Sequence, residues 1–486
     1  MNLETLTIVE ARMALDAKEY SALELTNAYL EAIRAKDGDL PALPAGRHGG
    51  RQGIHAYLEV WEEVARAEAK RADERIARGE SAPLTGIPVA VKDNMLIEGR
   101  IASAASKILE NYVASYDATV ITKLKQQGVV FLGRTNMDEF AMGSSTENSA
   151  FGATKNPHDT SRVPGGSSGG SAAAVSGGMA LAALGSDTGG SIRQPAALCG
   201  SVGLKPTYGA VSRYGLIAMG SSLDQIGPIT RSVSDSRIVF DAIRGRDPKD
   251  STSIELAEHS KNKKLPVIGV LRRFSEHAEK DVLARFNETL KKLRASGYEV
   301  RDPVEASTLL DDSLAAYYIV MPAEASTNLA RYDGIRCGLS VPAETIGDVY
   351  AKTRGEGFGP EVRRRILIGT FVLSAGYADA YYRRATAMRE KIREDFVHTF
   401  ANGVDVLVTP TTPSPAFTFG EKADSLAMYA ADIFTVPVNL AGIPALSVPV
   451  GTVDREGKNL PVGFQIIAPH GGEETLFAVG ADVEKV

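Results

Sequence analysis

Residues 163–195 read VPGGSSGGSAAAVSGGMALAALGSDTGGSIRQP. Only Asp187 and Arg193 are charged in this stretch, and glycine, serine and alanine supply most of the rest. A flexible linker would be polar and repetitive and would lack an apolar centre. Here two small-residue clusters, 165–170 and 188–191, enclose an apolar segment that we interpret as a packed helix. Because glycine lets a backbone approach its neighbours closely, the stretch indicates a buried functional centre.

The 486-residue chain has the composition of a globular protein, with 44% hydrophobic and 23% charged residues. Its formal net charge of −6 disfavours a free-standing nucleic-acid-binding protein, which normally presents a basic face. The two cysteines, Cys199 and Cys337, indicate neither a disulfide framework nor a structural zinc site, so we interpret them as small core residues in a reducing compartment. The charged N-terminus is not typical of a signal peptide, and the longest near-apolar window, 172–184, is too short to span a bilayer.

Helical and strand patterns alternate along the chain and predict an α/β fold with a parallel or mixed sheet. We expect helices over residues 5–35, 58–79, 117–127, 280–294, 313–332, 360–400 and 474–486, and one capped by Ser234 that runs to Ile243. We expect strands over residues 87–91, 129–132, 267–271, 298–301, 404–409, 445–450 and 462–467. Residues 203–206 and 227–228 are interpreted as turns because they contain glycine and proline, and residues 37–53 as an exposed loop.

Residues 165–169 match G-x-S-x-G, the pattern of a nucleophile elbow. An elbow lies between an apolar strand and a helix, whereas the preceding residues 161–165 (SRVPG) are not typical of a strand. The seven histidines lie mostly in polar segments and offer no attractive general base. This match therefore gives only weak support to a hydrolase with a Ser–His pair.

A lysine base is the alternative, and Lys92 is the candidate. A lysine accepts a proton only when it is neutral, and burial favours that state. Lys92 follows the apolar run 87–91, which predicts a strand leading into the interior, although a lone lysine at a strand end is more often solvated. Ser167 and Ser191, each in a glycine-rich loop, would complete a relay in which Lys92 deprotonates one serine and that serine deprotonates the other. The candidate oxyanion hole is formed by the backbone N–H groups of Thr188, Gly189, Gly190 and Ser191.

Residues 165–173 (GGSSGGSAA) and 185–195 (GSDTGGSIRQP) closely resemble the amidase signature family, whose members use a Ser–cisSer–Lys triad. The resemblance implies that Ser191 is the nucleophile that forms an acyl-enzyme. It implies that Ser167 is the bridging serine, held by a cis peptide bond, and that Lys92 is the base. The three residues together therefore predict amide hydrolysis.

The resemblance covers nearly the whole chain. It implies a single domain over residues 1–486, with a helical segment at about 1–80 and a large mixed β-sheet flanked by helices on both faces. Within the family, the chain is similar to the glutaminase subunits, called A, of the tRNA-dependent amidotransferases. The stretches that carry this similarity are VKDN (91–94), RTNMDEFAMG (134–143), SLDQIGP (222–228), EGFGPEVRRRI (356–366) and PVNLAG (437–442). The loop 37–53 departs from the family's pattern in its length and its Pro/Gly content.

This similarity implies a cytoplasmic enzyme that hydrolyses glutamine and supplies ammonia within a heterotrimer with the B and C subunits. The ammonia would convert Glu-tRNA(Gln), Asp-tRNA(Asn) or both. The chain shows neither a P-loop nor a metal motif, so ATP and Mg²⁺ are expected on the partner, the tRNA mainly on the B subunit, and no cofactor, metal or membrane contact in this chain. Two alternatives stay open: a stand-alone amidase that acts on other amides, and a catalytically silent scaffold protein.

Free glutamine carries an α-carboxylate and an α-ammonium beside its amide, so a selective site needs a cation and an anion. By similarity, Arg365 is expected to hold the carboxylate and Asp432 the ammonium. Tyr317, and less directly Tyr318, are expected nearby. Four other charged residues are interpreted as supporting: Arg363 and Arg364 on a solvated helix face, and Asp187 and Arg193 around the nucleophile loop.

Overall fold

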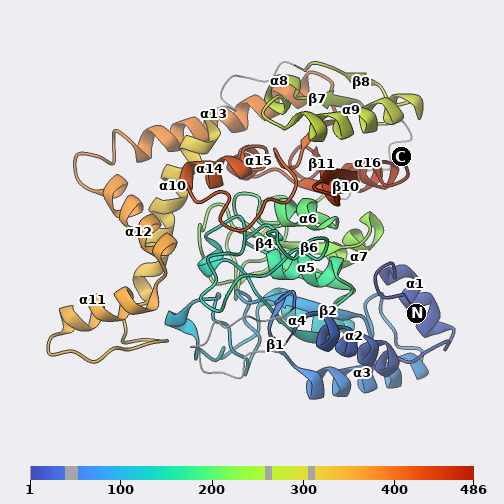
Figure 1. The fold of residues 1–486 in the computed structure, drawn as a ribbon, viewed down its shortest axis with the longest axis horizontal. Helices are drawn as coiled ribbons and strands as arrows, with labels where there is room; N and C mark the ends of the chain where they lie inside the picture. The colour runs from blue at the N-terminus through green and yellow to red at the C-terminus, as the bar shows by residue number, and fades with distance from the viewer. Residues whose placement is uncertain (1, 39–52, 258–264, 305–311) are drawn as a thin grey trace.

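One eleven-stranded mixed β-sheet forms the centre of the protein (Figure 1). The structure is a computed structural model that describes residues 2–38, 53–257, 265–304 and 312–486. The strand order is β1-β3-β2-β4-β6-β5-β10-β11-β9-β7-β8. The strands are β1 (Tyr57–Val60), β2 (Pro88–Lys92), β3 (Val130–Thr135), β4 (Ala182–Asp187), β5 (Val202–Lys205), β6 (Gln225–Thr230), β7 (Ile268–Val270), β8 (Val300–Arg301), β9 (Val406–Pro410), β10 (Ala445–Arg455) and β11 (Lys458–Ile467).

Helices cover both faces of this sheet, as predicted. In chain order the first eight are α1 (Ile8–Asp16), α2 (Ala22–Lys36), α3 (Glu62–Ala77), α4 (Thr119–Gln127), α5 (Gly169–Ser176), α6 (Arg193–Cys199), α7 (Val233–Ile243) and α8 (Arg272–Ser275). The others are α9 (Lys280–Ala295), α10 (Ser313–Asn328), α11 (Ile346–Gly357), α12 (Pro360–Leu373), α13 (Tyr382–Ala401), α14 (Ser425–Tyr429), α15 (Val436–Ala441) and α16 (Glu473–Val483). Helices α4, α7, α16 and α9 contact one another in that succession, whereas α5 and α6 pack together beside the central strands.

The parallel strands β3, β2 and β4 position the functional centre. β2 pairs in parallel with β3 on one side and with β4 on the other. Every residue of these three strands is buried, which explains why each begins as an apolar run without alternation. α5 packs against β4 and β2, so the small residues of 163–195 lie in the middle of the molecule.

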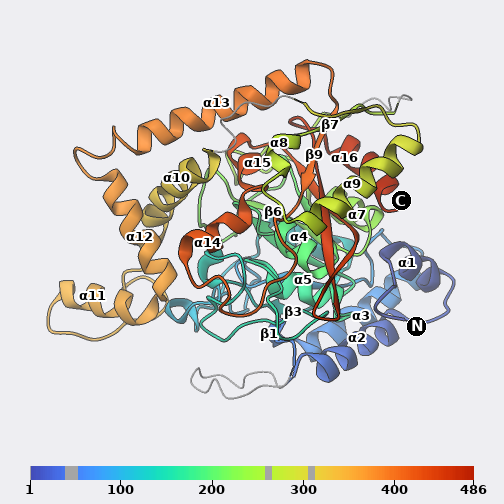
Figure 2. The same ribbon diagram turned by 45° about the horizontal axis from the view of Figure 1, so that its top comes forward.

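Helices α10, α11, α12 and α13 extend to one side of the sheet. α10 packs against both α12 and α13, and α11 lies beyond them at the edge of the molecule (Figures 1 and 2). Tyr317 lies on α10 and Arg365 on α12. These helices therefore carry two of the predicted substrate-binding residues.

Several local expectations are wrong. The apolar segment between the two small-residue clusters is not one packed helix, because α5 ends at Ser176 and the chain continues into β4. Residues 203–206 and 227–228 lie mostly in β5 and β6 and not in turns. A side chain at Gly227 would lie 2.1 Å from Leu204 O, so glycine here permits close strand pairing, and tertiary packing outweighs the local turn preference.

Three helix boundaries also differ from the predictions. The predicted helix over 58–79 begins as strand β1 and becomes α3 only at Glu62. The stretch 360–400 is two helices, α12 and α13, and α7 is capped by Ser232 in place of Ser234. Both Ser232 and Ser234 are good cap residues, so sequence alone does not distinguish them. The loop 37–53 lies outside the described residues except at its ends.

Candidate active site

Two parallel strands bring Lys92 and Asp187 to the same edge of the sheet. Lys92 is the last residue of β2, Asp187 is the last residue of β4, and the two strands are neighbours. The carboxyl ends of parallel strands meet at one edge, where α/β proteins typically place their sites. The Lys92 side chain is fully buried. Burial lowers its pKa to about 7, because water no longer stabilises the ammonium form.

Serine oxygens surround the Lys92 amine. Nζ lies 2.8 Å from Ser167 Oγ, 2.8 Å from Ser168 Oγ and 2.9 Å from Ser186 Oγ. The peptide bond between Gly166 and Ser167 is cis. At neutral pH a substantial fraction of Lys92 is unprotonated, and its lone pair can then accept the Ser167 proton.

Ser191 lies in the loop between β4 and α6, beside the two serines of the first loop. Its carbonyl oxygen accepts a hydrogen bond from the Ser168 N–H at 3.2 Å. Ser191 is 8% exposed, whereas Ser167 is 0% exposed, so Ser191 is the one that a substrate can reach. Within the described part of the chain no hydrogen bond joins the two hydroxyls. Catalytic hydrogen bonds are often long without substrate and tighten when it binds.

Asp187 and Arg193 hold the nucleophile loop. The Asp187 carboxylate accepts hydrogen bonds from the N–H groups of Gly190 and Ile192 and forms a fully buried ion pair with Arg193, with 3.0 Å between Nη2 and Oδ1. Burial alone would raise the pKa of Asp187, but the Arg193 guanidinium brings it down to about 2. The carboxylate therefore stays charged and keeps the loop in one conformation.

The hydrogen bonds to Asp187 remove one of the predicted donors from the oxyanion hole. The Gly190 N–H donates to Asp187 Oδ1 at 2.8 Å, so it is not available to an oxyanion. Thr188 is held through its side chain, whose Oγ1 donates to Asp224 at 2.7 Å. The N–H groups of Gly189 and Ser191 are therefore better candidates than that of Gly190.

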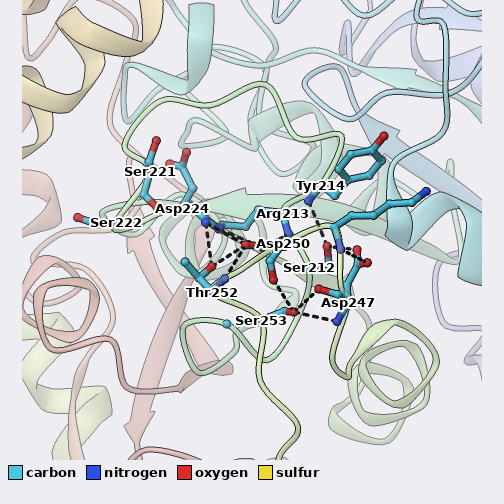
Figure 3. A network of polar contacts seen from close by, with 12 residues as sticks. Ser212, Arg213, Tyr214, Ser221, Ser222, Asp224, Asp247, Asp250, Thr252 and Ser253 are labelled. Carbon is cyan, nitrogen blue, oxygen red and sulfur yellow. Dashed lines mark hydrogen bonds and ion pairs between the residues drawn. The ribbon is translucent and has the colours of Figure 1, made fainter.

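Asp224, which accepts the hydrogen bond from Thr188, belongs to a network of polar contacts (Figure 3). Asp224 also accepts hydrogen bonds from the N–H groups of Met219 and Gly220. The same segment is bonded to the outer helices, because Glu324 on α10 accepts from the Ser222 hydroxyl and N–H. Figure 3 shows Arg213 beside Asp224 and Asp250, and these three line a cavity of about 210 Å³. The nucleophile loop is therefore linked to α10 through residues 219–224.

Arg365 is buried on α12, while Arg363 and Arg364 on the same helix are exposed. Arg365 Nε donates to Glu361 at 2.7 Å, and its guanidinium lies 5.4 Å from the ring centroids of both Tyr318 and Tyr429. In the described residues Glu361 is its only ion-pair partner. Other N–H groups of the guanidinium can therefore donate hydrogen bonds to a ligand carboxylate.

Asp432 lies at the end of the short 3₁₀ helix η5 (Ala430–Asp432) and is buried. Its carboxylate accepts a hydrogen bond from the Ser144 hydroxyl. Burial raises its pKa to about 7. No ion pair joins Asp432 to Arg365 in the part of the chain that the structure describes, so each charge is left for a partner of opposite sign.

Tyr317 and Thr435 place these charges next to the nucleophile loop. A methyl group at Gly189 would lie 2.6 Å from the Tyr317 hydroxyl oxygen. Thr435 Oγ1 donates to the Gly189 carbonyl at 2.6 Å and also contacts the Asp432 carbonyl. The structure therefore brings all the predicted site residues into one region, including Tyr318, whose ring contacts that of Tyr317.

The sequence analysis did not predict several residues of this site. Ser168 and Ser186 contact Lys92, and Gln194 accepts a hydrogen bond at 2.9 Å from the N–H of Gly166, the residue before the cis bond. All three lie in or beside the small-residue clusters, where serine and glutamine had no distinguishing pattern. Cys199 is buried as predicted, while Cys337 is only partly buried.

A family profile described as Amidase matches residues 49–477. The chain belongs to the amidase family. The A subunit of glutamyl-tRNA(Gln) amidotransferase from Thermoanaerobacter pseudethanolicus is 50% identical to it, over 100% of this chain and 97% of that protein. The protein of the same name from Carboxydothermus hydrogenoformans is also 50% identical, over 100% and 98%. The resemblance to the amidase signature family is confirmed.

Solved amidase-family structures have the same fold. The A subunit of glutamyl-tRNA(Gln) amidotransferase from Thermotoga maritima is 40% identical, with a TM-score of 0.76 over 100% of this chain and 95% of that one. The peptide amidase from Stenotrophomonas maltophilia is 28% identical, with a TM-score of 0.79 over 99% and 96%. Among the described residues, no helix is long and apolar enough to cross a membrane, and no group of three His, Cys, Asp or Glu side chains could hold a metal ion.

Proposed function

We propose that this amidase-family chain is the glutaminase subunit of a tRNA-dependent amidotransferase. The observation that carries the chemistry is the buried Lys92 amine, 2.8 Å from the hydroxyl of Ser167 and next to the loop of Ser191. The relatives that are 50% identical bear the name of such a subunit. The charges of Arg365 and Asp432 match the two charged groups of free glutamine.

In the reaction, Ser191 Oγ attacks the side-chain amide carbon of glutamine. Its proton passes to Ser167, and the Ser167 proton passes to Lys92. The N–H groups of Gly189 and Ser191 stabilise the developing oxyanion. The relay then returns a proton to the amide nitrogen, ammonia leaves, and the glutamyl ester on Ser191 is hydrolysed by water to glutamate.

The ammonia is used by a partner. The proposed complex is a heterotrimer with the B and C subunits, in which the partner binds ATP, Mg²⁺ and most of the tRNA. The acceptor is Glu-tRNA(Gln), Asp-tRNA(Asn) or both. This chain itself contributes no cofactor, and its place of action is the cytoplasm, where tRNA is charged.

The test compares hydrolysis of glutamine with that of aryl, peptide and fatty amides, by the chain alone and after co-expression with the B and C subunits. Glutamine is expected to be the preferred substrate of the complex, and ammonia from it should amidate the misacylated tRNA. Faster turnover of the other amides would favour a stand-alone amidase, an activity that the fold supports in the Stenotrophomonas peptide amidase.

Replacing Arg365 by lysine should raise the KM for glutamine about 10- to 100-fold, because a charge-assisted hydrogen bond of about 1.5–3 kcal/mol is lost. The KM for 4-aminobutanamide should not change, because this substrate has no carboxylate for Arg365 to bind. Asp432→Asn should also raise the KM for glutamine. It should not raise the KM for 4-carbamoylbutanoate, which has no ammonium for Asp432 to bind. Steady-state kinetics on the three substrates measure this.

The matched control is Arg363→Lys, on the exposed face of the same helix. It should leave KM unchanged for all three substrates. Equal losses on every substrate for Arg365→Lys would contradict a role in binding the carboxylate.

A further inference from the structure

Asp138 is a buried carboxylate that contacts the cis peptide of the relay serine. It follows β3 and is 0% exposed. A methyl group added at Gly166 would lie 2.1 Å from Asp138 Oδ2, so the carboxylate packs directly against the glycine of the cis bond. On the other side of that bond, the Asp138 N–H donates to the Ser167 carbonyl at 3.3 Å. Asp138 therefore contacts both residues that the cis bond joins, Gly166 and Ser167.

The Asp138 carboxylate accepts hydrogen bonds from the N–H groups of Thr146 at 2.9 Å and Asn148 at 3.1 Å. These donors are neutral, and in the described residues no cation forms an ion pair with Asp138. Its negative charge is therefore not cancelled locally and acts on its surroundings. Its position is fixed by the two backbone donors and by Gly166.

The charge of Asp138 acts on Lys92. Three acids raise the pKa of Lys92 against the effect of burial, in the order Asp138, Asp187 and Asp224. Asp187 is paired with Arg193, and the positive charge of Arg213 acts on Asp224 and lowers its pKa against the effect of burial. Burial raises the pKa of Asp138 itself to about 6, while the two backbone donors and Lys92 oppose that rise, and Glu147 is the other acid that acts on it. Asp138 is thus largely ionised at neutral pH and is the least compensated acid that faces the base.

We propose that Asp138 is a positioning residue that fixes the relay serine and sets the proton affinity of Lys92. Without it, desolvation would lower the pKa of Lys92 further, and the amine would become a weaker base. A general base works best when its pKa lies near the working pH. Asp138 keeps Lys92 near that value while it holds Ser167 in reach. This inference rests on the proposed glutaminase chemistry.

The test is the pH dependence of kcat for glutamine in the full chain, alone and co-expressed with the partner subunits. The parameter kcat reports the enzyme–substrate complex, in which Asp432 is already paired with the substrate ammonium. Activity rises with pH as Lys92 loses its proton, and the charge of Asp138 favours the protonated form. Asp138→Asn should therefore lower kcat. It should also move the acidic limb of the pH profile, where activity rises with pH, about one pH unit downward. The KM for glutamine should stay unchanged, since Asp138 is not proposed to contact substrate. Asp138→Glu, which retains the charge, should restore the position of the limb even if kcat remains reduced.

Asp138→Ala provides a second charge-removing variant, because it places no amide donor opposite the Thr146 and Asn148 N–H groups. The matched control is Glu147→Gln, which removes a neighbouring acid that does not act on Lys92 and should leave the limb in place. An unmoved acidic limb in both charge-removing variants, with folding verified by circular dichroism, would overturn the proposal. Absence of glutaminase activity in the wild-type complex would instead overturn the proposed function, so the two failures are distinguishable.

Discussion

Ser191→Ala is expected to reduce glutamine hydrolysis at least about a thousandfold, in kcat and not in KM. The alanine lacks the hydroxyl that forms the acyl-enzyme, and Ser167 cannot replace it because it is fully buried and engaged with Lys92. The binding charges of Arg365 and Asp432 stay in place, so glutamine should still bind. Ammonia release and isothermal titration with glutamine measure the two effects separately.

The matched control for this change is Ser176→Ala, at the C-terminal end of α5. Ser176 donates to the Cys199 carbonyl, away from Lys92, so its loss should leave kcat unchanged. In the assembled complex, Ser191→Ala should stop amidation of tRNA from glutamine but permit amidation from added ammonium. Undiminished glutamine-dependent amidation would show that the chain is a catalytically silent scaffold.

Lys92→Met is expected to reduce kcat about 10²- to 10⁴-fold, the usual contribution of a general base. Methionine keeps the length and the burial of the side chain but cannot accept a proton. In the wild-type enzyme, activity should fall as the pH drops below about 7, because Lys92 becomes protonated and loses its lone pair. The residual activity of the methionine variant should no longer follow that titration. The pH profile of kcat for both proteins is the measurement, because kcat reports the enzyme with substrate bound.

The matched control is Lys205→Met, which removes a second buried lysine. Lys205 is fully buried, and burial lowers its pKa to about 7 as well, but its Nζ donates to the Pro206 carbonyl. Among the described residues, no serine forms a hydrogen bond with Lys205 Nζ. Lys205→Met should therefore leave the acidic limb in its wild-type position. If Lys205→Met removed the limb and Lys92→Met did not, the general base would be misassigned.

The predictions that succeeded came from long runs and from ordered motifs. Strand β2 was predicted from the apolar run 87–91, and the family was predicted from the ordered motifs 165–173 and 185–195. The two turn predictions that failed concerned glycine and proline. Both residue types favour turns in isolation, but in β5 and β6 they permit close packing of neighbouring strands. Local preference is weak compared with the free energy of burying a strand between two others.

The G-x-S-x-G match shows why a motif needs its structural context. It places Ser167, the relay serine beside Lys92, at the position where an elbow would have its nucleophile. The residues before it include Val163, whose N–H pairs with Phe417 in a loop and not in a strand. The nucleophile proposed here is instead Ser191, in the second small-residue cluster.

The amino-acid sequence by itself determined the family, the α/β class and the identity of the residues that could react, because these depend on residue type and on order along the chain. Only the tertiary structure decided how those residues meet. Lys92 and Ser167 are 75 positions apart, and they meet because β2 and β4 are parallel neighbours and α5 packs against both. The charge on Asp187 is cancelled by Arg193, and that of Asp138 is left to act on Lys92. Burial and the arrangement of neighbouring charges set proton affinity, and both arise only when distant segments pack together.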